Sequence, residues 1–262
     1  MNRNYLLNFS SLLVLGLAVL FLAPESFSQS TKTYASQVPI LLGTHSGQPL
    51  VADFLKEQAA APDSRRMAKD DRFKHPRGPI SDPGLIANGS QEDIQPWIVD
   101  SVGAIEPIPV AGSTAIVIGT VTSGQAHIGY DRSSVYSEYR ITVQQILKHD
   151  SQIPISLADA IIGTREGGTI KFPSGHIRHY LRINQGFPQI GKQLVFFLWR
   201  SPNTTTADYG IVTAYLVDGG KVYPIDPGKP YEEYEGANST QFISNISTAI
   251  TANGQGSTGG RQ

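Results

Sequence analysis

The segment 135–143 is the clearest β-strand in this chain, and it requires a fold that covers one of its faces with a core. Its sequence, Val-Tyr-Ser-Glu-Tyr-Arg-Ile-Thr-Val, alternates between apolar and polar residues, and this period of two places successive side chains on opposite faces. The residues expected to face the core are Val135, Tyr139, Ile141 and Val143. The face expected to be polar carries Tyr136, Glu138, Arg140, Thr142 and Gln144. The adjacent Ile146 and Leu147 break the alternation and predict a bulge near Gln144 and Gln145.

Two other segments are apolar nearly throughout. Residues 115–121 and 194–199 have the composition of strands that are buried on both faces. Gly119, inside the first run, indicates a bulge or the close approach of another strand. The polar segment 123–134 contains several turn-forming residues and is expected to form an exposed loop.

Two hairpins and one helix are predicted in the second half of the chain. The first hairpin joins strands at 169–172 and 176–183 through Pro173-Ser174-Gly175, and the second joins 211–217 to 222–225 through Asp218-Gly219-Gly220. Ser239 or Thr240 can then cap a helix. The apolar stripe of this helix consists of Phe242, Ile243, Ile246, Ala249 and Ile250. We expect the stripe to cover the outer face of the strands, over 194–199.

These elements predict an all-β fold, either a small OB-like barrel or a sandwich, with a C-terminal capping helix and a flexible N-terminal extension. The expected division is a signal peptide over 1–28, a largely irregular extension and linker over 29–110, a β-barrel domain over 111–230, an acidic loop and C-terminal helix over 231–250, and a disordered tail over 251–262. Within the extension, 62–84 mixes basic and acidic residues and has almost no apolar ones. Such a segment is expected to be a flexible linker, and a basic binding arm is the alternative.

The first residues have the order of a secretory signal peptide. Arg3 precedes an apolar run at 12–23, followed by Pro24 and by small residues at Ser26 and Ser28, so cleavage after Ser28 is expected. Twelve apolar residues are too few to span about 30 Å of hydrocarbon. The chain has no cysteine, and the lack of disulfides in an exported protein favours a bacterial, secreted or periplasmic one. A net charge of −1 gives no reason to expect a nucleic-acid partner.

Several short motifs resemble a group of secreted bacterial proteins of unknown function, of the kind found in acidobacteria. The motifs, in order, are 135–139, Ile146-Leu147-Lys148, Gly167-Gly168, Phe172-Pro173-Ser174-Gly175, Gln185-Gly186-Phe187-Pro188, Gly191 and 194–198. The resemblance covers about residues 112–226. It implies secretion and these domain limits, and it implies no activity. The strand order also resembles OB-type and netrin-like barrels, but the netrin-like inhibitors depend on an N-terminal cysteine that this chain lacks.

One row of side chains is the candidate ligand-binding face. Alternation along 176–183 places His176, Arg178, Tyr180 and Arg182 on one side. Two guanidinium groups beside an aromatic ring suit a carboxylate, a phosphate or a sugar face, and an ordinary solvated strand face is the alternative. The same alternation places His179 on the apolar side, so the His-x-x-His pair does not predict a metal site.

No catalytic constellation is predicted. Ser174 lies at a hairpin tip and lacks the context of a nucleophile elbow, and no cofactor motif is present. The sequence therefore favours a non-catalytic binding or structural module, with another secreted protein or an envelope glycan as partner. The alternative is a hydrolase of envelope polymers with Glu138 or His176 in its cleft, which would require polar residues to converge in one pocket.

Overall fold

The computed structural model describes residues 42–59, 66–67, 69, 73, 79–84, 92–97, 106–200 and 208–256. The expected signal peptide lies outside these residues. Within them, no helix is long and apolar enough to cross a membrane.

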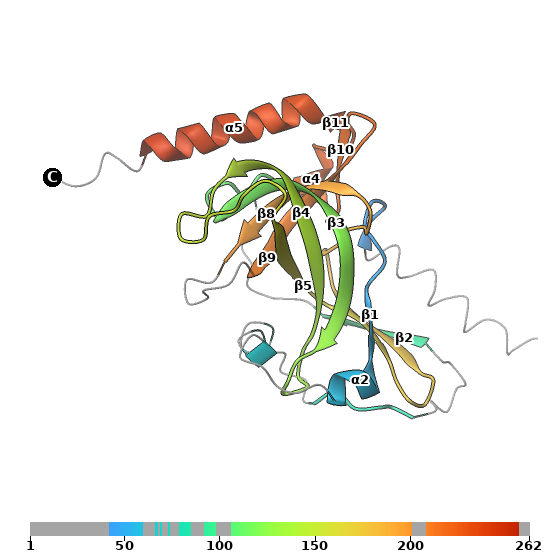
Figure 1. Ribbon diagram of the computed structural model, residues 1–262. Coiled ribbons are helices and arrows are strands. Elements are labelled where there is room, and N and C mark those ends of the chain that lie inside the picture. The colour runs from blue at the N-terminus through green and yellow to red at the C-terminus, as the bar shows by residue number, and fades with distance from the viewer. Residues whose placement is uncertain are drawn as a thin grey trace, which may run out of the picture.

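The main sheet closes on itself as a ring (Figure 1). Its strands are β3 (Ala115–Ile128), β4 (Val135–Lys148), β5 (Ala160–Glu166), β8 (Gln193–Trp199) and β9 (Asp208–Asp218). The ring runs β3-β4-β5-β9-β8 and closes because β8 pairs with both β9 and β3. The β5–β9 pair is parallel and the other pairs are antiparallel. The sheet continues beyond β9 with β10 (Lys221–Pro224) and β11 (Ala237–Asn238). This architecture confirms the all-β fold.

The core inside the ring follows the predicted alternation. Tyr139, Ile141 and Val143 of β4 pack there with Phe196 of β8. The register between β3 and β4 skips Gln144 and Leu147, which confirms the bulge. Gly119 is a point of close approach, because a Cβ there would lie 2.7 Å from the Thr142 carbonyl oxygen.

Strand β3 is longer than expected, since 123–128 belongs to it and is not an exposed loop. This half of β3 pairs with the first half of β4, and Ala126 and Ile128 are buried. The connecting turn is only 129–134. Polar residues at alternate positions hid the strand, because they face solvent while their neighbours face the core.

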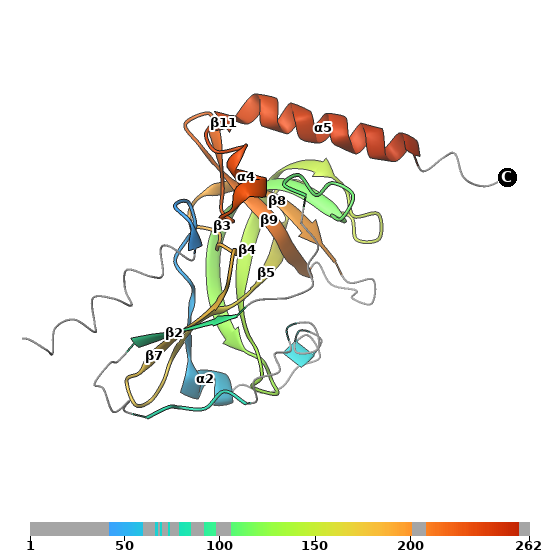
Figure 2. The same ribbon diagram turned by 180° about the vertical axis from the view of Figure 1, so that it is seen from behind.

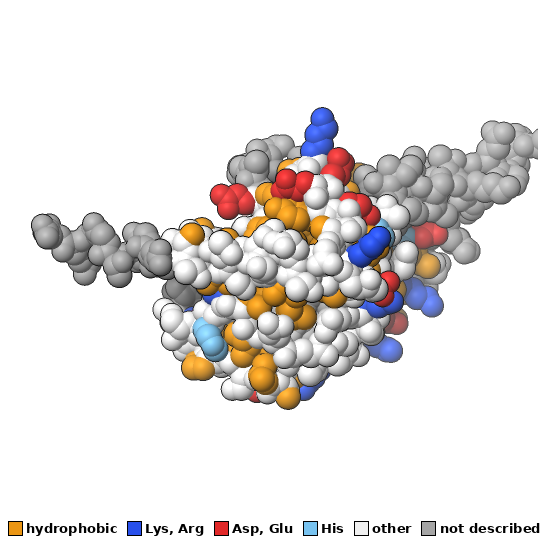
Figure 3. Space-filling view, turned by 90° about the horizontal axis from the view of Figure 1, so that it is seen from above, with side chains coloured by type: hydrophobic (Ala, Val, Ile, Leu, Met, Phe, Trp, Pro, Cys, Tyr) orange, Lys and Arg blue, Asp and Glu red, His pale blue; other side chains and the backbone are white. Residues whose placement is uncertain are grey.

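The C-terminal helix α5 (Ser239–Gly256) covers the outer face of the barrel, as predicted. Its Phe242 and Ile246 are buried in one cluster with Val195 and Phe197 of β8, so 194–198 is buried on both faces, whereas Trp199 at the end of the predicted run is exposed. The helix continues through 251–256, which we expected to belong to a disordered tail. The short α4 (Lys229–Glu232) precedes it. Figure 3 looks onto α5, whose sequence has no charged residue.

A second, smaller sheet lies at the end of the molecule away from α5 (Figure 1 and Figure 2). The predicted hairpin is present as β6 (Gly168–Lys171) and β7 (Ile177–Arg182), with β1 (Val51–Asp53) beside β6 and β2 (Glu92–Trp97) beside β7. Both outer strands are parallel to their neighbours and come from the segment expected to be irregular. The hairpin leaves two open edges, and these strands satisfy the backbone groups along them. Helix α2 (Phe54–Ala59) follows β1 directly.

Candidate functional site

The predicted row on β7 is paired within the chain. His176 is buried, and its Nε2 lies 2.9 Å from Asp93 Oδ1. Arg178 donates to the same carboxylate, with Nε to Oδ1 at 2.8 Å and Nη2 to Oδ2 at 2.8 Å. Asp93 can do this because β2 places it directly opposite Arg178. Asp93 therefore engages two of the four residues predicted to bind a ligand.

The other two residues of the row also have intramolecular partners. Tyr180 packs against an apolar cluster that contains Phe54 and Ile170, and Arg182 Nη1 lies 3.4 Å from Glu166 Oε2. We expected all four side chains of the row to face solvent, and this is wrong for His176, which is buried. Ligand binding by the row stays a prediction, although its cationic groups already have carboxylate partners.

The two histidines of the His-x-x-His pair contact different acids. His179 Nε2 lies 2.5 Å from Glu92, whereas His176 contacts Asp93. Among the described parts of the chain, no group of three or more His, Cys, Asp or Glu side chains could hold a metal ion. Ser174 Oγ donates to Asp82 Oδ1 at 2.6 Å, in the hairpin turn where the sequence places it.

Asp93 should make stability depend on pH in the acid range. Burial raises its pKa, but the hydrogen bonds and charges of Arg178 and His176 lower it more, so the net pKa is below the ordinary 3.8. A lowered pKa stabilises the folded chain above the ordinary value, and this contribution is lost as pH falls through the folded value. Urea unfolding from about pH 5 to about pH 3 should show a larger loss of stability in the wild type than in Asp93→Asn. Equal losses in both proteins would contradict this assignment.

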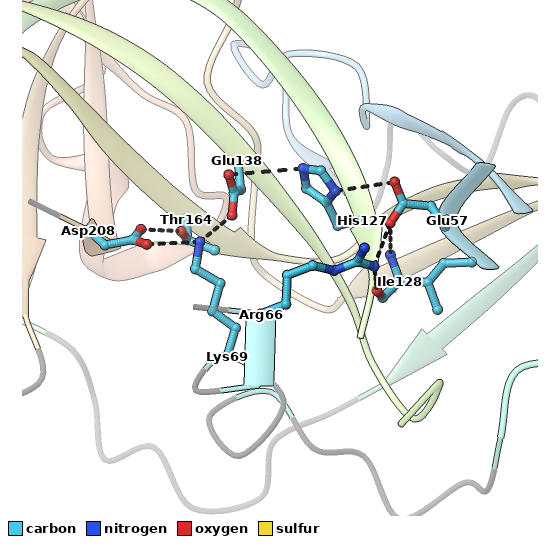
Figure 4. A network of polar contacts seen from close by, with 8 residues as sticks. All are labelled: Glu57, Arg66, Lys69, His127, Ile128, Glu138, Thr164 and Asp208. Atoms are coloured by element: carbon cyan, nitrogen blue, oxygen red, sulfur yellow. Dashed lines mark hydrogen bonds and ion pairs between the residues drawn. The ribbon is translucent and has the colours of Figure 1, made fainter. Parts of the chain in front are cut away.

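Polar side chains converge elsewhere, on the outer face of β4 and β5 (Figure 4). We call this surface the carboxylate face and define it by Glu57 of α2, Glu138 of β4 and Asp208 at the start of β9, with His127 of β3 and Tyr136 of β4 between them. Lys69 lies between two of the acids, with its Nζ in contact with Glu138 Oε1 and 3.1 Å from Asp208 Oδ2. The Oγ1 hydroxyl of Thr164, on β5, donates to Asp208 Oδ1 at 3.4 Å.

His127 lies between Glu57 and Glu138 on the carboxylate face. Its Nδ1 lies 3.2 Å from Glu57 Oε1, and its Nε2 lies 3.9 Å from Glu138 Oε2. Arg66 Nη2 donates to Glu57 Oε2 at 2.8 Å and to the Ile128 carbonyl at 2.7 Å. Burial raises the pKa of Glu57, but His127, Arg66 and the Ile128 amide together hold it below the ordinary value.

An aromatic ring forms the floor of this face. Tyr136 is fully buried, although the alternation of β4 places it on the polar side. The Nζ of Lys69 lies 5.4 Å from the centre of its ring, which is within cation–π range. The ring of Phe73 stacks on Tyr136 at 5.8 Å between centroids. Residues from outside the barrel thus bury a side chain that β4 alone would expose.

The three residues that cover this face come from the segment expected to be a flexible linker. Arg66, Lys69 and Phe73, which we call the cover residues, follow helical spacing, and the Phe73 amide donates to the Lys69 carbonyl at 2.9 Å. Lys69 and Phe73 are buried, so the linker interpretation is wrong at these positions. The i, i+3, i+7 spacing was the available signal, and the interspersed acidic residues obscured it.

The face brings together groups that could perform acid–base chemistry, but each is engaged. Glu138 is paired with Lys69, and the same ammonium also contacts Asp208. A hollow beside Glu57 is lined by Phe54, Glu57, Gln58, Arg66, Ile128, Gly129, Tyr130 and Arg132. Neither Glu138 nor Asp208 lines it. A hydrolase would need its acidic side chains to converge in one pocket. The acids of the carboxylate face lie close together, but Glu138 and Asp208 do not share this hollow with Glu57.

Replacing Lys69 by alanine should lower the free energy of unfolding by about 1–3 kcal/mol. The substitution would remove from Glu138 and the buried Asp208 the ammonium group that lies between their carboxylates. Urea denaturation measures the loss. Lys171→Ala is the matched control, because Lys171 is exposed on β6 and its replacement should change stability by less than about 0.5 kcal/mol. Equal effects of the two substitutions would show that the ion pairs of Lys69 do not stabilise the fold.

Comparison with known proteins gives no relative: no family model, no curated protein and no solved structure matches this chain.

Proposed function

We propose that this chain is an exported, non-catalytic binding module of a bacterial secreted family, built on an OB-like barrel, and that its partner is another exported protein. The ring order β3-β4-β5-β9-β8, with β5 parallel to β9, supports the OB-like part of the proposal, because five-stranded Greek-key barrels of that type close in this order. The apolar leader at 12–23 supports export.

The single observation that carries the proposal is the placement of the carboxylate face. In OB-type barrels the second and third strands, together with the loop before the second strand, bind the ligand. The corresponding parts here are β4, β5 and the 129–134 turn, and the carboxylate face lies over these strands. The correspondence is an analogy between folds, and the chemistry of the residues present supports it. Carboxylates that pair with lysine and arginine suit a protein partner better than a neutral glycan.

The hydrolase alternative has less support. A general acid or base must reach substrate, but Lys69 occupies the space between Glu138 and Asp208 and is itself buried. His127 is held between two carboxylates. A neutral polymer that displaced the cover residues would offer no cation to the Glu138 and Asp208 carboxylates in place of the Lys69 ammonium.

A photo-crosslinking experiment tests the proposal. A crosslinking amino acid would replace Tyr130, an exposed residue of the β3–β4 turn, in the chain expressed with its leader. The control position is the exposed Leu157, which lies in the β4–β5 connection beyond the other end of β4. We expect an adduct with another exported protein from position 130 and none from position 157, and an exported chain that begins at Gln29.

Polymer hydrolysis is measured in parallel. The purified chain is incubated with cell-envelope polysaccharides, and new reducing ends are counted. No release is expected. Release that disappears in Glu138→Gln would overturn the proposal in favour of the hydrolase, and adducts that form equally from both positions would refute the proposed binding surface.

A further inference from the structure

We propose that the carboxylate face recognises a basic segment with one aromatic residue in a partner protein, and that the cover residues occupy in cis the place of that segment. This inference rests on the proposed function and names its partner class. The observation behind it is that the face already holds an occupant of this chemistry, bound through separate side chains at separate positions (Figure 4).

Each cover residue has its own subsite. Arg66 is held by the Glu57 carboxylate and the Ile128 carbonyl. Lys69 is held by Glu138 and Asp208, above the ring of Tyr136. Phe73 stacks on the same Tyr136 ring. An anchor in each of several pockets is how a groove reads a short helical peptide, through i, i+3 and i+7 side chains.

The chemistry of the face restricts what can replace the cover residues. The side chains of Asp208 and Glu57 are 9 % and 6 % exposed, and that of Glu138 is 18 % exposed. Carboxylates as buried as these need a paired cation, since an unpaired buried charge is strongly unfavourable. An ammonium group also gains from the face of Tyr136. The face therefore selects lysine and arginine against neutral or acidic side chains.

The cover residues are held in a way that permits exchange. Arg66, Lys69 and Phe73 contact the barrel through their side chains, whereas β1 and β2 are joined to the small sheet by strand pairing. A partner segment with the same three side chains can make the same contacts. The cis segment competes with a partner for the site. The apparent affinity for the partner is therefore the intrinsic affinity multiplied by the fraction of molecules in which the face is open.

A peptide with the chain's own residues 62–76, Pro-Asp-Ser-Arg-Arg-Met-Ala-Lys-Asp-Asp-Arg-Phe-Lys-His-Pro, is the probe. Fluorescence anisotropy of the labelled peptide measures its binding to three full-length proteins: the wild type, the triple variant Arg66→Ala, Lys69→Ala, Phe73→Ala, and this triple variant with Glu138→Gln and Asp208→Asn added. The control peptide has alanine at the positions of Arg66, Lys69 and Phe73.

We expect the triple variant to bind the probe at least about tenfold more tightly than the wild type, because its own segment no longer competes. Binding should weaken at high salt, and it should be lost with the control peptide and in the protein that lacks Glu138 and Asp208. If the triple variant lacks a cooperative thermal transition, Lys69→Gln alone replaces it in the same comparison.

Two results overturn the inference. Equal or absent binding of the probe to the wild type and to the uncovered variant would show that the cover is only structural. A wild-type dimer that forms with rising concentration, and that Lys69→Gln abolishes, would assign the face to a second copy of this chain. Either result leaves the proposed function standing if crosslinking at position 130 still captures an exported protein, so the two failures are distinguishable.

Discussion

Replacing Asp226 by alanine is expected to lower the free energy of unfolding by about 3–5 kcal/mol. The Asp226 carboxylate is buried and accepts hydrogen bonds from Arg165 Nη2, from the Gly186 amide at 2.8 Å and from Thr213 Oγ1 at 2.7 Å. Arg165 is buried as well, and its Nε and Nη1 have no hydrogen-bond partner among the residues that the structure describes. Without Asp226 the Arg165 guanidinium would lose its carboxylate. The Gly186 amide and the Thr213 hydroxyl would also lose their acceptor.

Urea denaturation at neutral pH measures this loss. The matched control is Asp218→Ala, because Asp218 is exposed at the β9–β10 turn, and it should change stability by less than about 0.5 kcal/mol. Replacing both partners, with Arg165→Met and Asp226→Leu, should recover part of the loss, since no buried guanidinium is then left without its carboxylate, while the Gly186 amide and the Thr213 hydroxyl still lose their acceptor. A loss below about 1 kcal/mol in Asp226→Ala would mean that the buried pair does not stabilise the fold.

Gly186→Ala is expected to destabilise the chain by more than about 4 kcal/mol, which approaches the whole stability of an ordinary domain. A Cβ at this position would lie 1.8 Å from the Ile225 carbonyl oxygen and 2.7 Å from its carbonyl carbon. Both atoms belong to the backbone of a buried residue, so no side-chain rotation can relieve the contact. The necessary shift would also move Asp226, the next residue, away from the Gly186 amide.

Thermal unfolding followed by circular dichroism checks this second prediction. Gly112→Ala is the control, because the nearest atom to its added Cβ is 4.0 Å away, and it should unfold at nearly the wild-type temperature. A Gly186→Ala variant with the wild-type transition would show that the 186–225 contact is looser than the structure has it. Because Gly186 and Asp226 are in contact, their substitutions should not be additive when combined.

Local spacing alone determined several elements of this protein. The alternation of β4, the hairpin of β6 and β7, the hairpin of β9 and β10, and the apolar stripe of α5 were all predicted and are present. Each depends on residues that are near one another in sequence, so the period and the turn residues carry the information. The buried character of 194–198 followed for the same reason.

Only the tertiary structure decided which distant segments meet. The alternation on β7 grouped Arg178 with His176, but it could not show that β2 places Asp93 against both. The charges of 62–84 were equally compatible with a solvated linker and with ion pairs to Glu57, Glu138 and Asp208. A polar residue has the same place in a sequence pattern whether water or a carboxylate faces it. The partner is set by strand pairing and packing between residues far apart in the chain, and for this reason the carboxylate face was not visible in the sequence.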